Sequence, residues 1–324
     1  LLDARLTAGW PALTQPNAIG SSLGLLGDEW TLLIVRSAFE GARRYGDWKA
    51  RLPISDSVLA ARLGTLLTAE VLQRVAATDG SGRDEYALTD AGLDLWQLLL
   101  CIWAWELRHV PGQSDRLPRM VHTTCGEEFE PVLRCGQCGV SAAADDVDAR
   151  FGPSGSFARS APVGSNRRRQ ISGRTEVGSS STGPSMFADT MSLIGSRWSS
   201  AVLGAAFLGA RRFRDFEQIG APPTVLSDRL RTFVELGVLE PTGGEAGEPA
   251  AYQLSAKGSA LFPVVVSFLV WGERWRPADD GPAVLATHRS CGATFLPQLA
   301  CSACGVSVEL ASLHVRTAQP TPAG

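Results

Sequence analysis

Apolar residues recur at helical spacing near the start of the chain. Trp30, Leu33 and Ile34 lie on one face of a helix predicted between Glu29 and Phe39. The segment 43–52 predicts a second, short helix. A third begins at Ser55, a residue type that favours the N-cap, and its leucines repeat every three or four positions. The pattern therefore predicts three helices in quick succession.

The periodicity then changes to that of strands. Residues 71–77 and 84–89 read as two strands around a turn that contains Asp-Gly, and residues 89–105 read as a long apolar helix. Three short helices, a β-hairpin and a long final helix describe a winged helix-turn-helix. In that fold the third helix enters the major groove and the hairpin reaches the flanking backbone. The expected class is mainly α with small β-hairpins (α+β), although any three-helix domain with a hairpin gives the same pattern.

The same pattern returns later in the chain. Residues 25–48 match 193–216 at an offset of 168, residues 57–72 match 224–239 at 167, and "YALTDAG" matches "YQLSAKG" at 166. Because the offset drifts by only two residues, insertions and deletions are small and fall in loops. One ancestral domain has therefore been duplicated.

A segment rich in small and polar residues separates the two copies. Between Gly152 and Ser185, 18 of 34 residues are Gly, Pro or Ser, a composition that cannot bury enough apolar surface to fold alone. Its arginines (Arg159, Arg167, Arg168, Arg169 and Arg174) belong either to a solvated spacer or to an arm that contacts phosphates. The predicted organisation is a tail (1–19), a winged-helix domain (20–115), a small extension (116–151), the linker (152–185), a second winged-helix domain (186–281), a second extension (282–316) and a tail (317–324).

Each extension carries the pattern H-x₂-C-x₉-C-x₂-C. It occurs as "HTTCGEEFEPVLRCGQC" and as "HRSCGATFLPQLACSAC". Three thiolates and one imidazole suit a closed tetrahedral Zn²⁺ site, which leaves no position for a catalytic water and points to a structural role. A disulfide with spare thiols and a redox switch that releases zinc remain alternatives. The predicted ligands of two structural zinc ribbons, one for each copy, are His122, Cys125, Cys135 and Cys138, and His288, Cys291, Cys301 and Cys304.

Composition narrows the class of protein. The 324 residues are 44% hydrophobic, carry a net charge of −3 and include seven cysteines, six of them in the two motifs. This distribution favours a reducing, cytoplasmic setting with metal sites. No export signal is evident, and the most apolar stretch, residues 93–107, is too short and too polar for a membrane span. The remaining cysteine, Cys101, lies in that apolar stretch and is expected in the core. No nucleophile, phosphate-loop or paired-carboxylate motif indicates an enzyme.

Four sequence motifs of the second copy resemble those of a known family. They are Gly-Ser-Arg-Trp at 195–198, Arg-Phe at 212–213, "VLSDRLRTF" at 225–233 and "YQLSAKG" at 252–258. Together they resemble the HxlR-type winged-helix transcription regulators, relatives of the MarR group. The resemblance implies a cytoplasmic bacterial regulator acting on the nucleoid. It also implies a homodimer joined through its terminal helices, which reads double-stranded DNA at a two-fold operator.

Two copies in one chain suggest an intrachain pseudo-dimer. Half-sites one turn apart lie about 34 Å from each other, and a flexible linker of this length spans roughly 29 to 35 Å. Two independent domains and further self-association remain alternatives.

The copies differ where DNA contact is expected. Residues 36–74 hold seven basic and four acidic residues, whereas residues 197–240 hold six and five. The second hairpin adds Glu245 and Glu248. Stronger phosphate attraction is therefore expected for the first copy, and hence an asymmetric operator. Arg62 and Arg229 match a family arginine that pairs with an acid, so base contact and a structural role both stay open for them. The candidate contacts are Arg43, Arg44, Ser55, Ser57, Arg62 and Arg83, and Arg211, Arg212, Thr224, Ser227 and Arg229.

Tryptophans gather on the two terminal helices. Trp96, Trp103, Trp271 and Trp275 either belong to the core or line a pocket for a small apolar or aromatic effector. The leading hypothesis is a sequence-specific, effector-responsive DNA-binding regulator. The alternative is a degenerate winged-helix pair that binds RNA polymerase or another regulator. A zinc hydrolase fits poorly, because neither predicted metal site has an open position.

Overall fold

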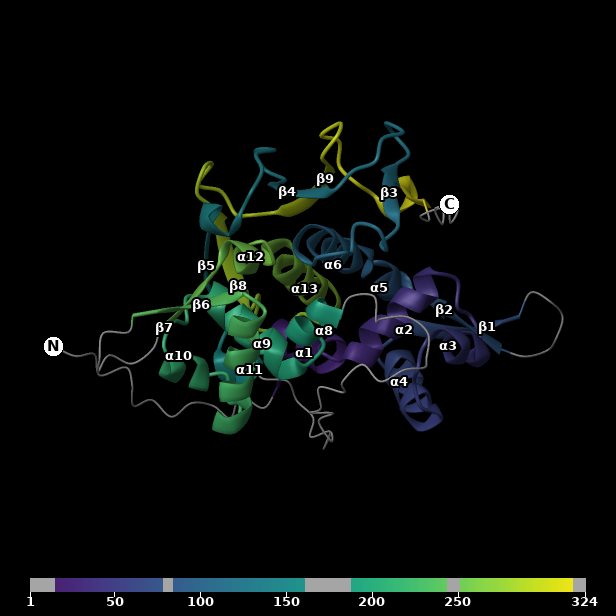
Figure 1. Ribbon diagram of the computed structural model, residues 1–324, viewed down its shortest axis with the longest axis horizontal. Helices are drawn as coiled ribbons and strands as arrows, with labels where there is room; N and C mark the ends of the chain where they lie inside the picture. Colours follow the sequence, from purple (N-terminus) through teal and green to yellow (C-terminus); the bar gives the residue numbers. More distant parts are fainter. Residues whose placement is uncertain (1–14, 78–83, 161–187, 244–250, 317–324) are drawn as a thin grey trace.

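The computed structural model describes residues 15–77, 84–160, 188–243 and 251–316, and the two copies lie side by side with their extensions stacked above them (Figure 1). The expected α+β class is confirmed. The first copy contains α1 (Ala18–Leu26), α2 (Glu29–Phe39), α3 (Tyr45–Arg51), α4 (Asp56–Thr68), β1 (Leu72–Ala76), β2 (Asp84–Leu88), α5 (Asp90–Leu93) and α6 (Trp96–His109). The second contains α8 (Ala188–Ile194), α9 (Arg197–Phe207), α10 (Phe213–Glu217), α11 (Pro223–Glu235), β6 (Leu239–Thr242), β7 (Ala251–Leu254), α12 (Ala256–Ser259) and α13 (Phe262–Trp275).

Corresponding caps start corresponding helices in the two copies. The Asp28 carboxylate accepts a hydrogen bond from the Thr31 amide at the start of α2, and the Ser196 hydroxyl accepts one from Ser199 at the start of α9. The third helices differ, because Ser55 caps α4 whereas α11 begins with a proline in its first turn. Each hairpin is antiparallel, with Leu72 opposite Leu88 and Leu239 opposite Leu254.

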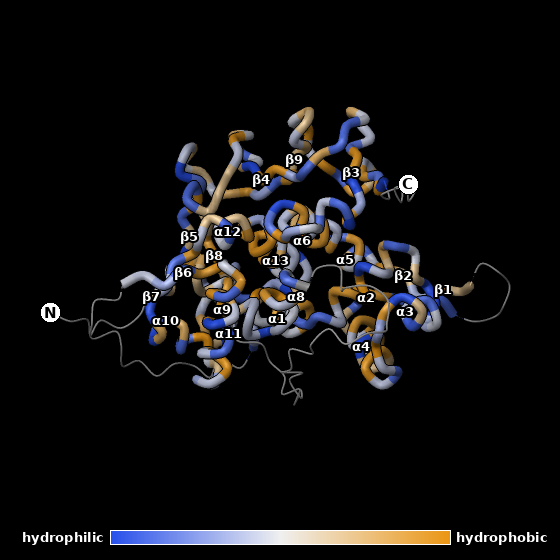
Figure 2. The backbone as a smooth tube through the Cα atoms, viewed as in Figure 1, coloured by the Kyte–Doolittle hydropathy of each residue, from blue (hydrophilic) through white to orange (hydrophobic). Residues whose placement is uncertain are grey.

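The terminal helices join the two copies. Helix α6 packs against α13, and the first helix of each copy crosses to the other copy, α1 onto α13 and α8 onto α6. Apolar stretches of these helices meet at the centre of the molecule (Figure 2). The contacts are reciprocal: the Trp105 indole donates to the Lys257 carbonyl (3.1 Å), and the Trp271 indole donates to the Ala91 carbonyl (2.8 Å). The copies therefore share one continuous core.

The two extensions are interleaved strand by strand. The first contributes β3 (Arg119–His122), β4 (Pro131–Cys135), the 3₁₀ helix η2 (Ala144–Asp146) and β5 (Val147–Phe151). The second contributes β8 (Val284–His288), β9 (Pro297–Cys301), the 3₁₀ helix η3 (Leu310–Ser312) and β10 (Leu313–Arg316). Strand β3 pairs with β10, β4 with β9 and β5 with β8, always antiparallel. Each pair thus takes one strand from each copy, and residues 116–151 and 282–316 form one unit instead of two separate extensions.

The beginning of the expected linker is packed against the fold. Helix α7 (Phe157–Ser160) lies beside α1, and Asn17, the N-cap of α1, donates to the Ser154 carbonyl at 3.0 Å. Arg159 is buried and bonds both carboxylate oxygens of Asp280. Residues 152–160 are therefore part of the folded unit. The other linker arginines lie outside the described residues. Among the helices that the structure describes, none is long and apolar enough to cross a membrane.

Candidate metal centres and nucleic-acid interface

The eight predicted ligands gather into two Cys₃His clusters. One joins His122 and Cys125 to Cys301 and Cys304, and the other joins Cys135 and Cys138 to His288 and Cys291. The ligand atoms within each cluster lie within 4.8 Å of one another. Two groups of three thiols and one imidazole are thus assembled, as the motif predicted.

The membership of each cluster differs from the sequence expectation. A site closed within each copy would join His122 to Cys135, whereas the structure joins the His-x₂-Cys pair of one copy to the Cys-x₂-Cys pair of the other. The cause is the strand exchange: β3, which ends at His122, pairs with β10, and β4, which ends at Cys135, pairs with β9. The metal centres therefore lie between the copies.

The spacing within the clusters fits zinc. The Nδ1 atom of His122 lies 3.6 Å from the Cys125 sulfur and 3.4 Å from the Cys304 sulfur. The sulfurs of Cys125 and Cys301 lie 3.9 Å apart. In a tetrahedron with Zn–S bonds of about 2.3 Å, two sulfurs are separated by roughly 3.8 Å. In the other cluster, Nδ1 of His288 lies 3.4 Å from the sulfurs of both Cys138 and Cys291.

Local structure holds the ligands in place. Gly126, Gly139, Gly292 and Gly305 follow ligand cysteines and adopt left-handed φ values between 67° and 78°, which lets the chain turn tightly behind each cysteine pair. Both histidines are fully buried, and their rings pack against Phe129 and Phe295. The Nε2 atoms of these histidines have no hydrogen-bond partner among the described residues. The imidazoles are therefore held by packing, with Nδ1 turned to the sulfurs.

The thiols differ in their surroundings, and within the clusters burial raises the pKa of Cys301. A hydrogen bond from the Val306 amide lowers the pKa of Cys304, which favours the thiolate that binds metal. Burial raises the pKa of Cys101 to about 12. The Cys101 sulfur lies 3.4 Å from the Ser267 hydroxyl, where α6 crosses α13. Cys101 is therefore a core residue, as expected, and is poorly suited to reaction with electrophiles.

The two third helices project from the face opposite the metal centres. Helices α4 and α11 point to the same side of the molecule, with the strands β4 and β9 on the far side (Figure 1). On α4, Ser57 is exposed, as is the Ser55 cap that precedes it; on α11, Thr224 and Ser227 are exposed. Four predicted contact residues, in or next to these two helices, are thus exposed.

The predicted arginines of the third helices have internal partners. The Arg62 guanidinium donates two hydrogen bonds to the Asp28 carboxylate, at 3.0 and 2.9 Å, and both side chains are mostly buried. Arg229 lies 3.1 Å from the neighbouring Asp228. In the second copy Ser196 stands where the first has Asp28, so the bridge that joins the start of α2 to α4 is lost. The geometry favours the structural role for Arg62.

The predicted arginines that precede α3 and α10 are exposed. Arg44 bonds Glu85 on the hairpin at 2.8 Å, whereas Arg211 donates to the carbonyls of Ala206 and Ala210. Arg43 and Arg212 are exposed as well. Arg83, Glu245 and Glu248, the predicted hairpin residues, lie outside the described residues.

One exposed base on α11 was missed by the sequence reasoning. Arg231 lies one helical turn after Ser227, has a side chain 67% exposed and approaches Asp228 at 2.5 Å. Its counterpart in the first copy is Gly64. The spacing of four residues from Ser227 was the available signal, because positions i and i+4 share a helix face.

The four tryptophans of the predicted effector pocket separate into two groups. Trp103 and Trp271 are buried, and their indoles bond backbone carbonyls. Trp96 and Trp275 border a shallow hollow beside Asp94, to which the Trp275 indole donates at 2.8 Å. The structure does not bring the four together around one cavity.

Comparison with known proteins identifies the family. The HxlR-like helix-turn-helix family matches residues 25–114 and 193–280, more than half of the chain. The chain belongs to this HxlR-like family. The resemblance is confirmed, and the tandem organisation with it. HxlR-like helix-turn-helix proteins are DNA-binding transcription regulators and not enzymes, so the interaction-module alternative is not favoured.

Relatives match about one copy at a time. An uncharacterised HTH-type transcriptional regulator of Mycobacterium tuberculosis is 36% identical over 139 residues, which cover 43% of this chain and 88% of the relative. The HTH-type transcriptional regulator YodB of Bacillus subtilis is 28% identical over 109 residues, which cover 33% of this chain and 90% of YodB. The crystal structure of PA1607 is 32% identical and covers 39% of this chain and 89% of PA1607, at a TM-score of 0.35. The family assignment rests on the sequence matches.

Proposed function

We propose that this HxlR-like regulator binds a single asymmetric DNA operator as an intrachain pseudo-dimer and responds to an effector. The observation that carries the proposal is the common direction of α4 and α11, which leaves both third helices accessible on one face (Figure 1). Two third helices on one face can enter successive major grooves of the same duplex. As a bacterial regulator it acts on the nucleoid in the cytoplasm.

The asymmetry follows from the exposed side chains. The accessible face of α11 offers Thr224, Ser227 and Arg231, whereas that of α4 offers Ser57 and Gly64 without a base at the matching position. Side chains that differ read different base edges, so the two half-sites of the operator differ in sequence. The Arg62–Asp28 pair supports the first copy from inside and leaves its exposed serines to make contacts.

The metal centres hold the two helices in register. We assign Zn²⁺ to both clusters, about two ions per chain, because the donor set and spacing suit closed tetrahedral sites. Each ion would crosslink the two copies. Zinc analysis of the purified chain tests this assignment separately from DNA binding.

Mobility-shift titration with the chain's own promoter region, at two salt concentrations, tests the function. Ser57→Glu and Ser227→Glu each place a negative charge on one third helix, and each is expected to weaken binding by about tenfold or more through phosphate repulsion and lost contacts. Val315→Glu adds the same charge at an exposed position of the metal-bearing unit that is not next to a metal ligand, and should change the affinity little. Absence of any shift at low salt would reject the proposal. Equal loss for all three variants would reject the assignment of the binding face.

A further inference from the structure

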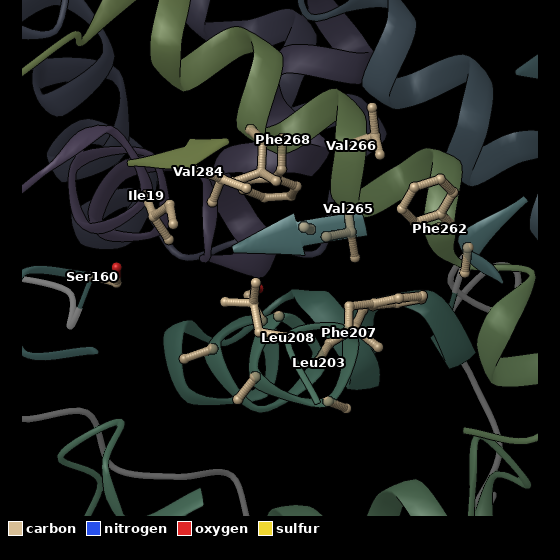
Figure 3. A pocket seen from close by; sticks show the side chains of 18 of the residues that line it. Ile19, Ser160, Leu203, Phe207, Leu208, Phe262, Val265, Val266, Phe268 and Val284 are labelled. Atoms are coloured by element: carbon tan, nitrogen blue, oxygen red, sulfur yellow. The ribbon is translucent and has the colours of Figure 1, made fainter. Parts of the chain in front are cut away.

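A cavity of about 340 Å³ lies in the second copy, between α9 and α13. Leu203 and Phe207 of α9 and Leu208 just after it form one wall, and Val265 and Phe268 of α13 face them (Figure 3). The first copy also contributes to the wall, through Ile19, Ser22 and Leu23 of α1 and through β5. Side chains of both copies therefore line the cavity.

The first copy has a large side chain where the second has this space. Trp103 of α6 is replaced at the matching position of α13 by Leu269, which lines the cavity. The Trp103 indole donates to the Pro118 carbonyl at 2.9 Å, and the residue that matches Pro118 is Val284, another wall of the cavity. The missing indole therefore accounts for much of the space.

A glycine on α9 enlarges the same space. Gly204 lines the cavity, and a Cβ added there would meet no atom within 4 Å. The first copy has Arg36 at the matching position. Glycine inside a helix lowers stability by about 0.5–1 kcal/mol relative to alanine. Because a Cβ at position 204 would meet no neighbour, the packing of the second copy does not require glycine there.

One polar group on the wall lacks a partner. The Ser22 hydroxyl is buried, 1% of the residue being exposed, and has no hydrogen-bond partner among the described residues. The residue that matches Ser22 in the second copy is Thr190, whose amide and hydroxyl both donate to the buried Glu106. The residue that matches Glu106 is Gly272, so Ser22 has lost the corresponding acceptor. The hydroxyl packs against Gly272 instead, because a Cβ added there would lie 2.3 Å from the Ser22 Oγ atom.

From these observations we infer that the cavity binds an uncharged, mainly apolar molecule of about two fused rings. An apolar cavity of about 150 Å³ holds one benzene ring, so this one has room for a second. Arg211 and Asp145 both lie on the lining and offset each other's charge, which favours neither an anion nor a cation. This site differs from the group of tryptophans considered on sequence grounds.

The regulatory consequence rests on the proposed function. Helix α9 packs against α11, while α1 and β5 belong to the first copy. A molecule in the cavity would touch α9 and the first copy at once. It would therefore change how firmly α11 is held relative to α4, and with it the affinity for an operator that both helices read.

Calorimetric titration of the full chain with 2-naphthol tests the site without DNA. Leu269→Trp restores the residue of the first copy, and Gly204→Leu fills the cavity from α9; each is expected to weaken binding by about tenfold or more. Gly46→Leu is the matched control, because a Cβ at this exposed helical glycine of the first copy also meets nothing within 4 Å. It should bind as the wild type does.

Failure to bind 2-naphthol up to its solubility limit would overturn the inference, as would unchanged affinity in both filled variants. A mobility-shift titration with and without 2-naphthol then measures the regulatory effect. If 2-naphthol binds the wild type but not Leu269→Trp, and no DNA is shifted under any condition, the site stands and the proposed function fails. If DNA binds equally with and without 2-naphthol, only the regulatory consequence is lost.

Discussion

The two halves of the central core have the same plan and different contents. Around α6, Trp103 fills the space beside the extension and Glu106 bonds Thr190. Around α13, Leu269 leaves a cavity, and Gly272 leaves the Ser22 hydroxyl without an acceptor. In a dimer of identical chains both halves must carry the same residues. A fused pair lifts that requirement, because each half has to fit only the other one.

The metal centres allow the strongest test of how the halves are joined. Cys125→Ser combined with Cys301→Ser removes two ligands from one cluster, so about one zinc ion per chain should remain. Cys125→Ser combined with Cys135→Ser removes one ligand from each cluster, and the zinc content should approach zero after dialysis against a weak chelator. Elemental analysis of the full chain gives the counts. If the first double variant lost nearly all zinc and the second kept about one ion, each copy would close its own site.

The stability of the protein should depend more on Trp103, which fills its half of the core, than on Leu269, which lies beside the cavity in the other half. Trp103→Leu should lower the free energy of unfolding by about 2 to 3 kcal/mol, because it opens a cavity and leaves the Pro118 carbonyl without its donor. Leu269→Trp should change it by less than about 1 kcal/mol, because the indole enters existing space. Urea denaturation followed by circular dichroism measures both. Equal losses would contradict the difference in packing.

The bridge between Asp28, at the start of α2, and Arg62 of α4 exists in the first copy and not in the second. Arg62→Ala should lower the free energy of unfolding by about 1 to 2 kcal/mol, because Arg62 and Asp28 are both mostly buried and joined by two hydrogen bonds. Arg229→Ala, which removes a contact with a partly exposed neighbour, should cost less than about 1 kcal/mol. The same denaturation experiment compares them. A larger loss for Arg229→Ala would reverse the assignment of the structural arginine.

The smallest expected effect is a pH dependence of the stability. It arises from Glu106 of α6, whose counterpart on α13 is Gly272. Burial raises the pKa of Glu106 above its ordinary value of 4.5, which means that the folded protein favours the protonated form. The protonated Glu106 carboxyl therefore contributes its full stabilisation below the pKa that Glu106 has in the unfolded chain. This contribution is lost as the pH rises through the pKa that Glu106 has in the folded protein. Glu106→Gln should remove this loss, so its stability relative to wild type should rise with pH by roughly a few tenths of a kcal/mol per unit above pH 4.5. Thermal unfolding across that range checks the sign, and a falling difference would refute it.

The amino-acid pattern predicted the local elements well and the partnership between copies poorly. Helical spacing and caps such as Ser55 are local signals, and so is the cysteine motif, which predicted the donor set of each cluster. The grouping of His122 with Cys304 instead of Cys138 has no local signal, because both copies carry identical spacing and either pairing completes a Cys₃His set. The cavity was equally hidden, since Leu269 and Gly204 look like ordinary helix residues until their counterparts, Trp103 and Arg36, are placed in space.

The exchange of strands also sets an order of events during synthesis. Cys125 lies 176 residues before Cys301, with which it shares a cluster. At about 5 to 20 residues per second, the ribosome needs roughly 10 to 35 seconds to make the intervening chain. Until then the first extension has two incomplete sets of ligands and unpaired strand edges. The first copy must therefore stay soluble without its metals until residues 288–304 have been made, and this segment completes both centres.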